Sequence, residues 1–399
     1  MPSLENISST TASGERSTGA SLPIAILALA GFLIVTTEFL IIGLLPALAR
    51  DLGMSISDAG LLVTLFAFTV MLFGPPLTAL FSHLDRKRTF IVILLIFAAS
   101  NALAALSTSV WVLAIARFIP ALALPVFWGT ASETASLLAG PRHAGKAVAQ
   151  VYLGISAAML LGIPLGTVFA DAVGWRGAFW ALAALSACMA ALLALSMPRL
   201  APTPKVALAQ QARILRDPLF IMNLLLSILL FTAMFAAYTY LADMLERIAH
   251  IESARVGWWL MGFGAVGLIG NALGGRYVDR SPLGSTLIFT ALLALGMSAC
   301  VPLAGSLSGL IAMLAVWGIA HTALFPICQI RVMKAAPQAQ ALAGTLNVSA
   351  ANAGIGLGSI IGGATIEHLG LEAIGYVAAA LAAVAIVIAW QLWRGHLKT

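Results

Sequence analysis

Long uncharged apolar segments recur along this 399-residue chain, and each is about as long as a helix that crosses a lipid bilayer. They leave 9% of the residues charged and 61% hydrophobic, with a mean hydropathy of +1.02. A water-soluble core cannot enclose so much apolar surface, because soluble domains carry about 25% charged residues. The pattern predicts an integral membrane protein that contacts the lipid bilayer. It argues against secreted enzymes, cytosolic domains and nucleic-acid binding.

The apolar segments form two groups of six, which predicts an all-α membrane protein made of two pseudo-symmetric six-helix bundles. Each crossing needs roughly 20 apolar residues, and a polar stretch separates the two groups. The expected segments are 22–46, 58–81, 89–106, 110–138, 144–169, 177–197, 219–242, 256–277, 283–303, 308–333, 340–366 and 372–393. We therefore expect a disordered cytoplasmic tail at 1–21, bundles at 22–197 and 219–395, and a cytoplasmic linker at 198–218.

Basic residues gather in alternate loops, and this bias predicts how the chain is oriented in the membrane. Most of the 21 Lys and Arg residues fall in loops on one side if the N-terminus is cytoplasmic. Cytoplasmic loops carry an excess of Lys and Arg, so both termini are expected in the cytoplasm of a multi-pass inner (plasma) membrane protein. The net charge of +6 is then a topology signal and requires no anionic partner.

Two strings resemble nucleotide-binding motifs, but neither has the context that such a site needs. Gly140 to Lys146 has the spacing of a phosphate loop, yet Ala147 replaces the hydroxyl residue that holds magnesium. Gly262 to Gly267 matches a dinucleotide fingerprint inside an apolar helix, where glycines usually serve helix packing. The cysteines are scattered and no histidines have ligand spacing, so we expect no cofactor and no metal.

Two ionisable residues lie deep inside predicted helices, where a charge is costly unless it faces the bundle interior or water. Glu38 lies just past the midpoint of the first segment, and Arg117 lies at a similar depth in the fourth. If they pair, the arginine favours the ionised carboxylate while burial favours the neutral acid. A transporter can use this opposition to load and release a proton. A static structural ion pair is the alternative.

Uncharged polar and aromatic residues inside other segments are candidates for contacts with a small-molecule substrate. Amide, phenol, imidazole and indole groups can line a cavity for a polyhydroxylated or amphipathic compound. For His321, near the middle of the tenth segment, proton relay, a substrate hydrogen bond and a satisfied neutral histidine are the alternatives. The candidates are Trp128, Tyr238, Tyr240, Trp317, His321, Gln329, Asn347 and Asn352.

Glycines follow one face of two predicted helices. Gly162 and Gly166 belong to such a face in the fifth segment, where Pro164 predicts a kink, and a second face runs from Gly354 to Gly362. Small residues let helices approach closely, which suits the interface between two six-helix halves. Static tight packing explains these glycines equally well.

The most specific strings resemble the major facilitator superfamily, and within it the drug:proton antiporter branch of sugar and arabinose efflux transporters. The likeness covers residues 22–395, and it implies a role in proton transfer for Arg117, which matches the family's helix 4 arginine. The strings that carry it are Thr36-Thr37-Glu38-Phe39, Gly43-Leu44-Leu45, Gly162-Ile-Pro164-Leu-Gly166, Gly174-Trp175-Arg176, Tyr238-Thr-Tyr240 and Asn352-Ala-Gly354-Ile-Gly356-Leu-Gly358.

The resemblance also implies residues that gate the transporter. The loop after the second helix departs from the family pattern, because Thr78 and Ser82 replace its usual Gly and Asp. The region after Arg117 also has Ala121 where the family has glycine. The matching loop of the second half keeps the pattern better. The gating and conformational candidates are Arg86, Arg88, Gly162, Pro164, Gly166, Gly275, Asp279 and Arg280.

The expected function is secondary active transport that exports a sugar or sugar-like compound by proton antiport with alternating access. The resemblance supplies the direction, and Glu38 would carry the proton while Arg117 tunes it. A monomer is expected. The alternatives are a multidrug or chloramphenicol-type efflux pump, a proton-symport uptake permease and, in another class, a membrane-embedded enzyme. The enzyme would need a converging nucleophile or metal set, which the sequence does not offer.

Overall fold

The computed structural model describes residues 16–81, 84–140, 144–198 and 212–396, and within these ranges the regular structure is helical. Ten helices are long and apolar enough to span a bilayer. One of them, Gln150–Ser196, turns back at Gly174 and so accounts for two crossings, and α13 supplies the twelfth. The predicted fold class, two six-helix bundles in a membrane, is confirmed.

The first half contains six crossings formed by α1 to α6. A π-helical turn, η1, interrupts the fifth crossing, which runs from α5 through η1 into the first part of α6. The elements are α1 Arg16–Leu52, α2 Ile56–Phe81, α3 Arg86–Leu106, α4 Val110–Ala139, α5 Ala144–Ala157, η1 Ala158–Gly162 and α6 Ile163–Ser196. Helix α1 therefore includes the last residues of the predicted tail, and 1–15 lie outside the described residues.

The second half repeats the plan with α8 to α14, and its first crossing is broken in two. Thr239 and Tyr240 form the break between α8 and α9. Most of the predicted linker, 199–211, lies outside the described residues. The elements are η2 Ala212–Arg216, α8 Pro218–Tyr238, α9 Leu241–Arg247, α10 Ser253–Val278, α11 Pro282–Cys300, α12 Leu307–Lys334, η3 Pro337–Ala339, α13 Gln340–Leu369, η4 Leu371–Ala373 and α14 Ile374–His396.

Local sequence explains where several helices begin and where the chain turns. Asp85 and Asp217 start α3 and α8, because each side chain accepts a hydrogen bond from a backbone N–H that the first helical turn leaves free. Gly174 turns the chain between the fifth and sixth crossings with a φ of 79°, which glycine adopts without strain. Short capped turns of this kind force successive crossings to run antiparallel.

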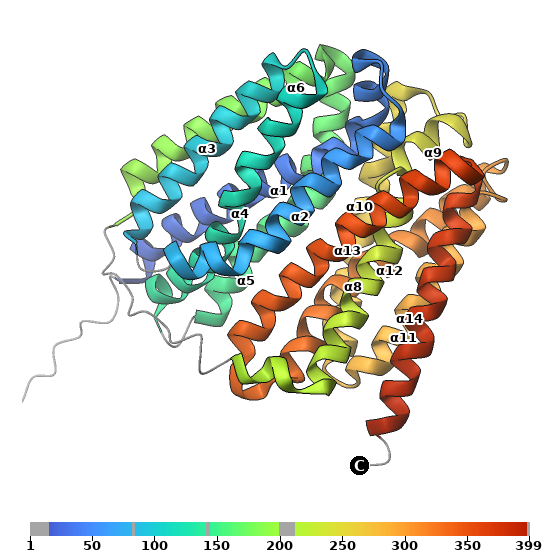
Figure 1. Cartoon of the computed structure of the whole chain (residues 1–399). Helices are drawn as coiled ribbons and strands as arrows, with labels where there is room; N and C mark the ends of the chain where they lie inside the picture. The colour runs from blue at the N-terminus through green and yellow to red at the C-terminus, as the bar shows by residue number, and fades with distance from the viewer. Residues whose placement is uncertain (1–15, 82–83, 141–143, 199–211, 397–399) are drawn as a thin grey trace, which may run out of the picture.

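The two halves lie side by side, and helices from each run along one another (Figure 1). Helix α2 packs along α13, and α6 with η1 packs against α10. Ser359 Oγ on α13 donates to Gly60 O at 2.7 Å. Further along the same pair of helices, Thr64 Oγ1 donates to Gly356 O at 3.2 Å. The contact between the halves is therefore close enough for side chains of one half to bond the backbone of the other.

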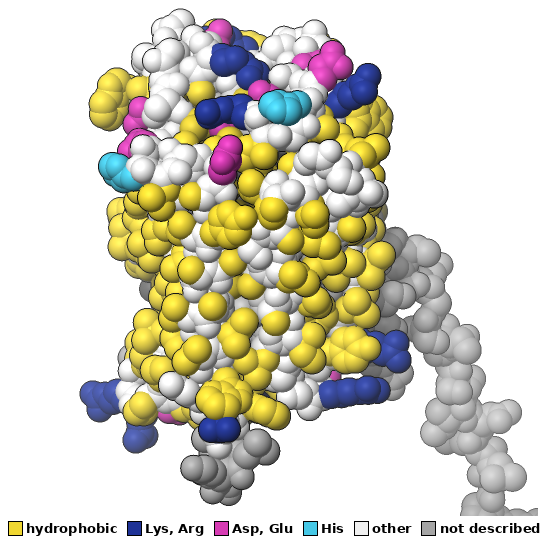
Figure 2. Space-filling model, turned by 90° about the vertical axis from the view of Figure 1, so that its right-hand side faces the viewer, with side chains coloured by type: hydrophobic (Ala, Val, Ile, Leu, Met, Phe, Trp, Pro, Cys, Tyr) yellow, Lys and Arg dark blue, Asp and Glu magenta, His cyan; other side chains and the backbone are white. Residues whose placement is uncertain are grey.

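Charged side chains gather at the two ends of the molecule, on either side of an apolar belt (Figure 2). The end with Arg86 and Lys334 is called the basic end, and the end with Asp51 and Glu246 is called the acidic end. At the acidic end Arg50 Nη1 lies 2.7 Å from Glu246 Oε2, which is the one ion pair between the halves within the described ranges. A cavity of about 380 Å³ lies beside this pair, between α1, α6 and α10.

Candidate functional site

Arg117 and Glu38 come together where α4 packs against α1. The Arg117 guanidinium donates from Nη1 to Thr37 O and from Nη2 to Glu38 O, each at 2.6 Å, and the residue is 2% exposed. Its central carbon lies 4.4 Å from the centre of the Phe66 ring. The predicted neighbourhood exists, but the arginine bonds the backbone of α1. Among the described residues Glu38 has no ion pair with it.

Two further elements fix this turn of α1. Asn101 on α3 donates from Nδ2 to Thr37 Oγ1 at 3.1 Å. Gly162, the last residue of η1, lies so close to the Thr36 hydroxyl that a Cβ at position 162 would overlap it. Thr36 Oγ1 is buried without a hydrogen-bond partner. Glu38 itself is only partly buried, and it directly follows Thr36 and Thr37, which these contacts hold in place.

The hydrogen bonds that hold Arg117 do not use the side chain of Glu38. Burial of a carboxyl group and a neighbouring guanidinium act in opposite directions on its protonation. The bonds from Arg117 go to carbonyl oxygens, which accept hydrogen bonds whether the Glu38 side chain is charged or neutral. The cation can therefore stay beside the carboxyl group in both protonation states.

The kink predicted at Pro164 takes the form of the π turn directly before it. Pro164 has no N–H to donate, so the usual helical bond is missing at this position. Ile163 N donates instead to Ala158 O, a five-residue step that places an extra residue in the turn. Gly264 of α10 packs onto the wide turn, where a Cβ would lie 2.9 Å from Leu160 Cα. The π turn thus lies at the contact between the halves.

The three predicted conformational residues of this segment all touch a neighbouring helix. A Cβ on Gly257 of α10 would lie 3.0 Å from Pro164 O. Gly162 lies against α1 as described, and a Cβ on Gly166 would lie 2.6 Å from Leu40 Cδ1 of the same helix. Glycine therefore permits the close approach of α1 and α10 to the fifth crossing.

Aromatic rings surround His321 in the middle of α12. The ring centres of Tyr238, Phe235, Phe325 and Phe263 lie 4.5, 5.5, 5.7 and 5.8 Å from that of His321. These five residues are called the His321 cage. His321 is fully buried, and neither of its ring nitrogens has a hydrogen-bond partner. A neutral imidazole offers one donor and one acceptor, and both are left unsatisfied in this packed arrangement.

Trp317 extends this group by one turn of α12. Its ring centre lies 5.6 Å from that of Phe263, which also belongs to the His321 cage. The Trp317 indole N–H is buried without a partner. The structure therefore brings Tyr238, Trp317 and His321 together out of the predicted substrate residues.

Two other predicted substrate residues have different surroundings. Tyr240 OH donates to Ser359 O at 2.8 Å and so ties the break between α8 and α9 to α13. Trp128 belongs to the first half, where its ring centre lies 5.3 Å from that of Tyr152 on α5. Neither residue contacts the His321 cage through a ring or a hydrogen bond that the described residues show.

The remaining amides bond mainly to each other and to the backbone. Asn347 Nδ2 on α13 donates to Gln329 Oε1 on α12 at 2.7 Å. Asn352 Nδ2 donates to Val348 O at 3.0 Å. The Oδ1 atoms of both asparagines are buried without a partner. In the part of the chain that the structure describes, no three His, Cys, Asp or Glu side chains lie close enough to hold a metal ion.

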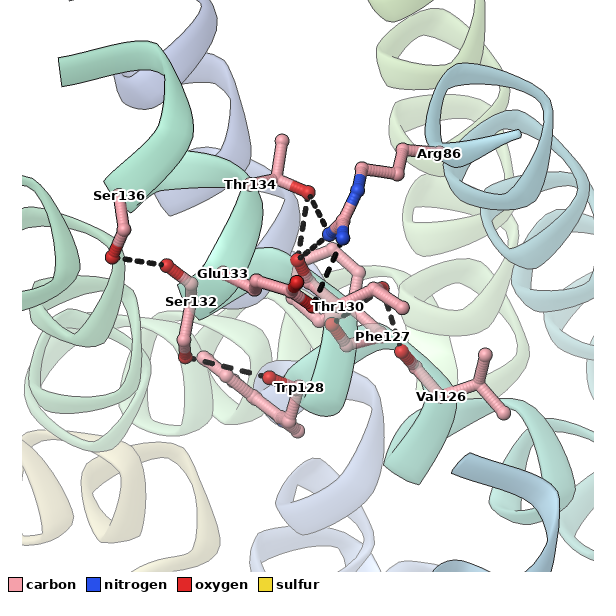
Figure 3. Close-up of polar contacts among 9 residues, drawn as sticks. All are labelled: Arg86, Val126, Phe127, Trp128, Thr130, Ser132, Glu133, Thr134 and Ser136. Atoms are coloured by element: carbon pink, nitrogen blue, oxygen red, sulfur yellow. Dashed lines mark hydrogen bonds and ion pairs between the residues drawn. The ribbon is translucent and has the colours of Figure 1, made fainter. Parts of the chain in front are cut away.

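At the basic end, the side chain of Arg86 on α3 contacts residues of α4 (Figure 3). Its Nη2 lies 2.9 Å from Glu133 Oε2, and its Nη1 donates to Thr134 Oγ1 at 3.0 Å and to Thr130 O at 3.3 Å. The Arg86 side chain is 1% exposed, whereas that of Glu133 is 46% exposed. The gating prediction named Arg86 without a partner, and Glu133 supplies the carboxylate.

The other predicted gating residues lie near the surface of the basic end. Asp279 Oδ1 lies 3.1 Å from Lys334 Nζ, which joins the end of α10 to the end of α12. Gly275 has open space where a Cβ would stand. The side chains of Arg88 and Arg280 are exposed. Asp279 is therefore tied to α12, while the exposed Arg88 and Arg280 belong to different halves.

Comparison with known proteins decides the family. Residues 27–348 and 244–397 match the model of the Major Facilitator Superfamily. The chain belongs to this superfamily. It is 33% identical over 378 residues to the Inner membrane transport protein YdhP of Escherichia coli (strain K12), covering 94% of this chain and 97% of that one. It is 31% identical over 364 residues to a probable sugar efflux transporter of Mannheimia succiniciproducens, covering 91% and 92%.

Solved structures of transporters share the fold. A bacterial homologue of the human lysosomal transporter Spinster, inward-facing and unoccupied, superposes with a TM-score of 0.79 at 17% identity, covering 96% of this chain and 98% of that one. The nucleoside transporter NupG gives 0.75 at 15% identity, covering 94% and 99%. Membership makes this chain a multi-pass membrane transporter rather than an enzyme.

Sequence reasoning missed the phenylalanines that build the cage. Phe235 and Tyr238 are three residues apart on α8, so they share one helix face. His321 and Phe325 are four residues apart on α12 and share a face in the same way. In a chain this apolar such spacing reads as ordinary packing. Only the unpartnered nitrogens of His321 distinguish the face, and they are visible only in the structure.

Proposed function

We propose that this Major Facilitator Superfamily member exports a sugar or sugar-like molecule in exchange for protons, by alternating access. It would act as a monomer in the inner membrane, with both termini and the basic end in the cytoplasm. The excess of Lys and Arg at that end supports the orientation. The printed names of the two relatives support the membrane and the substrate class.

The observation that carries the proposal is the position of Arg117 on the backbone beside Glu38. A buried cation, bonded to two carbonyl oxygens, lies next to a carboxyl group that has no ion-pair partner among the described residues. The two hydrogen bonds hold the guanidinium beside Glu38 without using the carboxylate oxygens. The carboxyl group is left available to exchange a proton, and we assign proton transfer to Glu38 with Arg117 as the residue that tunes it.

The substrate would bind beside the His321 cage in the second half. The polar groups at this place are uncharged. The Trp317 indole N–H and the two ring nitrogens of His321 have no hydrogen-bond partners, so they offer two donors and one acceptor. Aromatic faces suit the apolar face of a sugar ring, and hydroxyl groups can both donate and accept. Asn347, Asn352 and Gln329 of the second half, Tyr240 at the helix break and Trp128 of the first half remain candidates for contacts in other states of the cycle.

Alternating access would open and close contacts at the two ends. The glycine-lined π turn between the halves, with Gly162, Pro164 and Gly166, would serve as the pivot. At the basic end the Arg86–Glu133 pair would hold α3 to α4 through the cycle. Gly275, Asp279 and Arg280 of the second half and Arg88 of the first would form the contacts of the other state.

Transport in liposomes tests the proposal. The purified full-length protein is reconstituted with an imposed pH gradient, and internal pH is followed while pentoses, galactosides, nucleosides and chloramphenicol are added in turn. Proton flux that depends on one class of compound is expected in the wild type and absent in Glu38→Gln. Glu252→Gln makes the same change at an exposed glutamate and is the matched control, which should keep the flux.

The outcomes separate the parts of the proposal. Proton flux with Glu38→Gln equal to the wild type would remove Glu38 from the mechanism. Flux driven only by chloramphenicol would favour a drug efflux pump, a second candidate that the aromatic lining of the cage supports. Accumulation of the compound along the inward proton gradient would instead identify an uptake symporter.

A further inference from the structure

One aromatic contact joins the proton side of the molecule to the substrate side. Phe39 follows Glu38 on α1, and its ring centre lies 5.8 Å from that of Phe235 on α8, with the planes tilted by 32°. Among the described residues this is the one ring pair that spans the two halves. Phe39 is 6% exposed and Phe235 is fully buried. The contact is thus part of the packed core.

Phe235 is also a wall of the His321 cage. Its ring centre lies 5.5 Å from those of both His321 and Tyr238. A displacement of Phe39 therefore acts on a ring that touches the imidazole directly. Packed rings transmit displacement because interiors are dense and leave no slack between side chains.

The backbone that carries Phe39 is held by the groups around Glu38. Arg117 bonds the carbonyl oxygens of Thr37 and Glu38, which immediately precede Phe39. A change in how strongly the guanidinium is attracted to the Glu38 side chain changes its pull on those carbonyl groups. The shift would reach Phe39 within one peptide unit.

We propose that Phe39 and Phe235 couple the protonation of Glu38 to the shape of the His321 cage. This assignment rests on the proposed function, because it presupposes that Glu38 exchanges a proton. It makes Phe39 a positioning residue, since it acts on substrate through Phe235. Contacts between the halves on other helices, such as Ser359 of α13 to Gly60 of α2, involve neither Glu38 nor the cage and would not carry this signal.

The test follows Trp317 as a reporter on the substrate side. The full-length protein is labelled with 5-fluorotryptophan in lipid nanodiscs, and the Trp317 fluorine resonance is assigned with Trp317→Phe. Its position is recorded from pH 5 to 9, while the infrared carboxyl band that disappears in Glu38→Gln reports the protonation of Glu38. In the wild type the two titrations should coincide.

Variants at Phe39 isolate the ring contact. Phe39→Leu is expected to reduce the pH-dependent movement of the Trp317 resonance at least threefold while the Glu38 carboxyl band still titrates. Phe39→Tyr keeps the ring and should restore the movement. Phe179→Leu, which changes an equally buried ring of the first half that packs on Trp175, should leave it unchanged. Phe235→Leu is less informative, because it alters the cage itself.

The readouts fail separately. A Trp317 resonance that moves fully with pH in Phe39→Leu, or that stays fixed in the wild type while Glu38 titrates, would overturn the coupling role and leave proton exchange intact. A carboxyl band that never titrates in the wild type would overturn the proposed function, and the coupling role with it.

Discussion

The two halves of the molecule bury an arginine in similar ways, yet only one places an acid beside it. Arg117 of α4 bonds carbonyl oxygens of α1 next to Glu38. Arg331 of α12 donates to Asn223 O at 3.1 Å and to Ser227 Oγ at 2.9 Å on α8, and within the described ranges it has no carboxylate partner. The repeated architecture therefore supports different chemistry in each half.

The surroundings of His321 in the second half are aromatic, whereas those of Glu38 in the first half are mainly polar. His321 lies among four rings and bonds to nothing, whereas the turn around Glu38 is held by amide, hydroxyl and guanidinium groups. The two halves therefore share an arrangement of helices but place different side chains inside it. This difference supports a first half that handles protons and a second half that handles substrate.

The largest effect is expected from removing the buried cation of the first half. Arg117→Met should lower proton-coupled transport about 100-fold, equivalent to about 2.7 kcal/mol, because the charge beside Glu38 is lost. Methionine has a similar length and suits an apolar interior, so the protein should still fold. Liposome proton flux measures the effect, and Arg176→Met at the more exposed acidic end is the control. Flux at the wild-type level in Arg117→Met would contradict the assignment.

The contact between the halves can be tested with two neighbouring glycines. Gly264→Ala should destabilise the protein by about 2 kcal/mol and slow transport, because its Cβ would press on the backbone of the π turn. Gly262→Ala enters open space on the same helix and should cost little. Thermal unfolding in detergent compares them. Equal melting temperatures would show that the close approach at Gly264 does not constrain the fold.

The proposed substrate contact can be tested at the His321 cage. His321→Phe keeps an aromatic ring and removes the two nitrogen atoms that lack partners. The KM of whichever sugar drives proton flux should rise about tenfold, close to the value of one or two hydrogen bonds. The titration of the Glu38 carboxyl band should be unaffected. His368→Gln, at an exposed position, provides the comparison, and an unchanged KM in His321→Phe would place the substrate elsewhere.

The smallest effect is expected at the acidic end. The Arg50–Glu246 pair spans the halves, but the Arg50 side chain is 59% exposed, and exposed pairs contribute about 0–1 kcal/mol. Arg50→Gln should shift the balance between conformations by at most about fivefold, and less at high salt. Spin-label distances across the acidic end measure it. Arg255→Gln breaks a pair inside the second half and should shift nothing. A large shift that salt does not weaken would contradict this account.

The lengths of the apolar segments and the positions of the charged residues predict the arrangement of membrane helices, because a lipid bilayer constrains both. A helix must be long enough to cross, so the two groups of six segments and the depth match of Glu38 and Arg117 follow from counting residues. The break at Thr239 and Tyr240 does not follow, because the apolar run continues through it without a glycine or proline. Its bond from Tyr240 to Ser359, distant in sequence, stabilises it instead.

Details of the site depend on which atoms side chains reach, and a sequence does not contain that information. Arg117 is long enough to reach either the carboxylate of Glu38 or the carbonyl groups of α1, and in the structure its guanidinium bonds the carbonyl groups while it lies over the Phe66 ring. Pro164 indicates a kink but cannot say that a π turn absorbs it. The residues of the His321 cage come from three helices, and only folding shows that they converge.

The break between α8 and α9 leaves the short helix α9 bonded to both halves of the molecule. This seven-residue helix follows Tyr240, whose hydroxyl is anchored to α13 of its own half, and carries Glu246, which is tied to α1 of the other half. A helix of two turns has little cooperativity of its own. Its amide hydrogens should therefore exchange with solvent as soon as the tie to α1 opens, well before those of α8. The onset of amide exchange at α9 would therefore report when the two halves first separate at the acidic end.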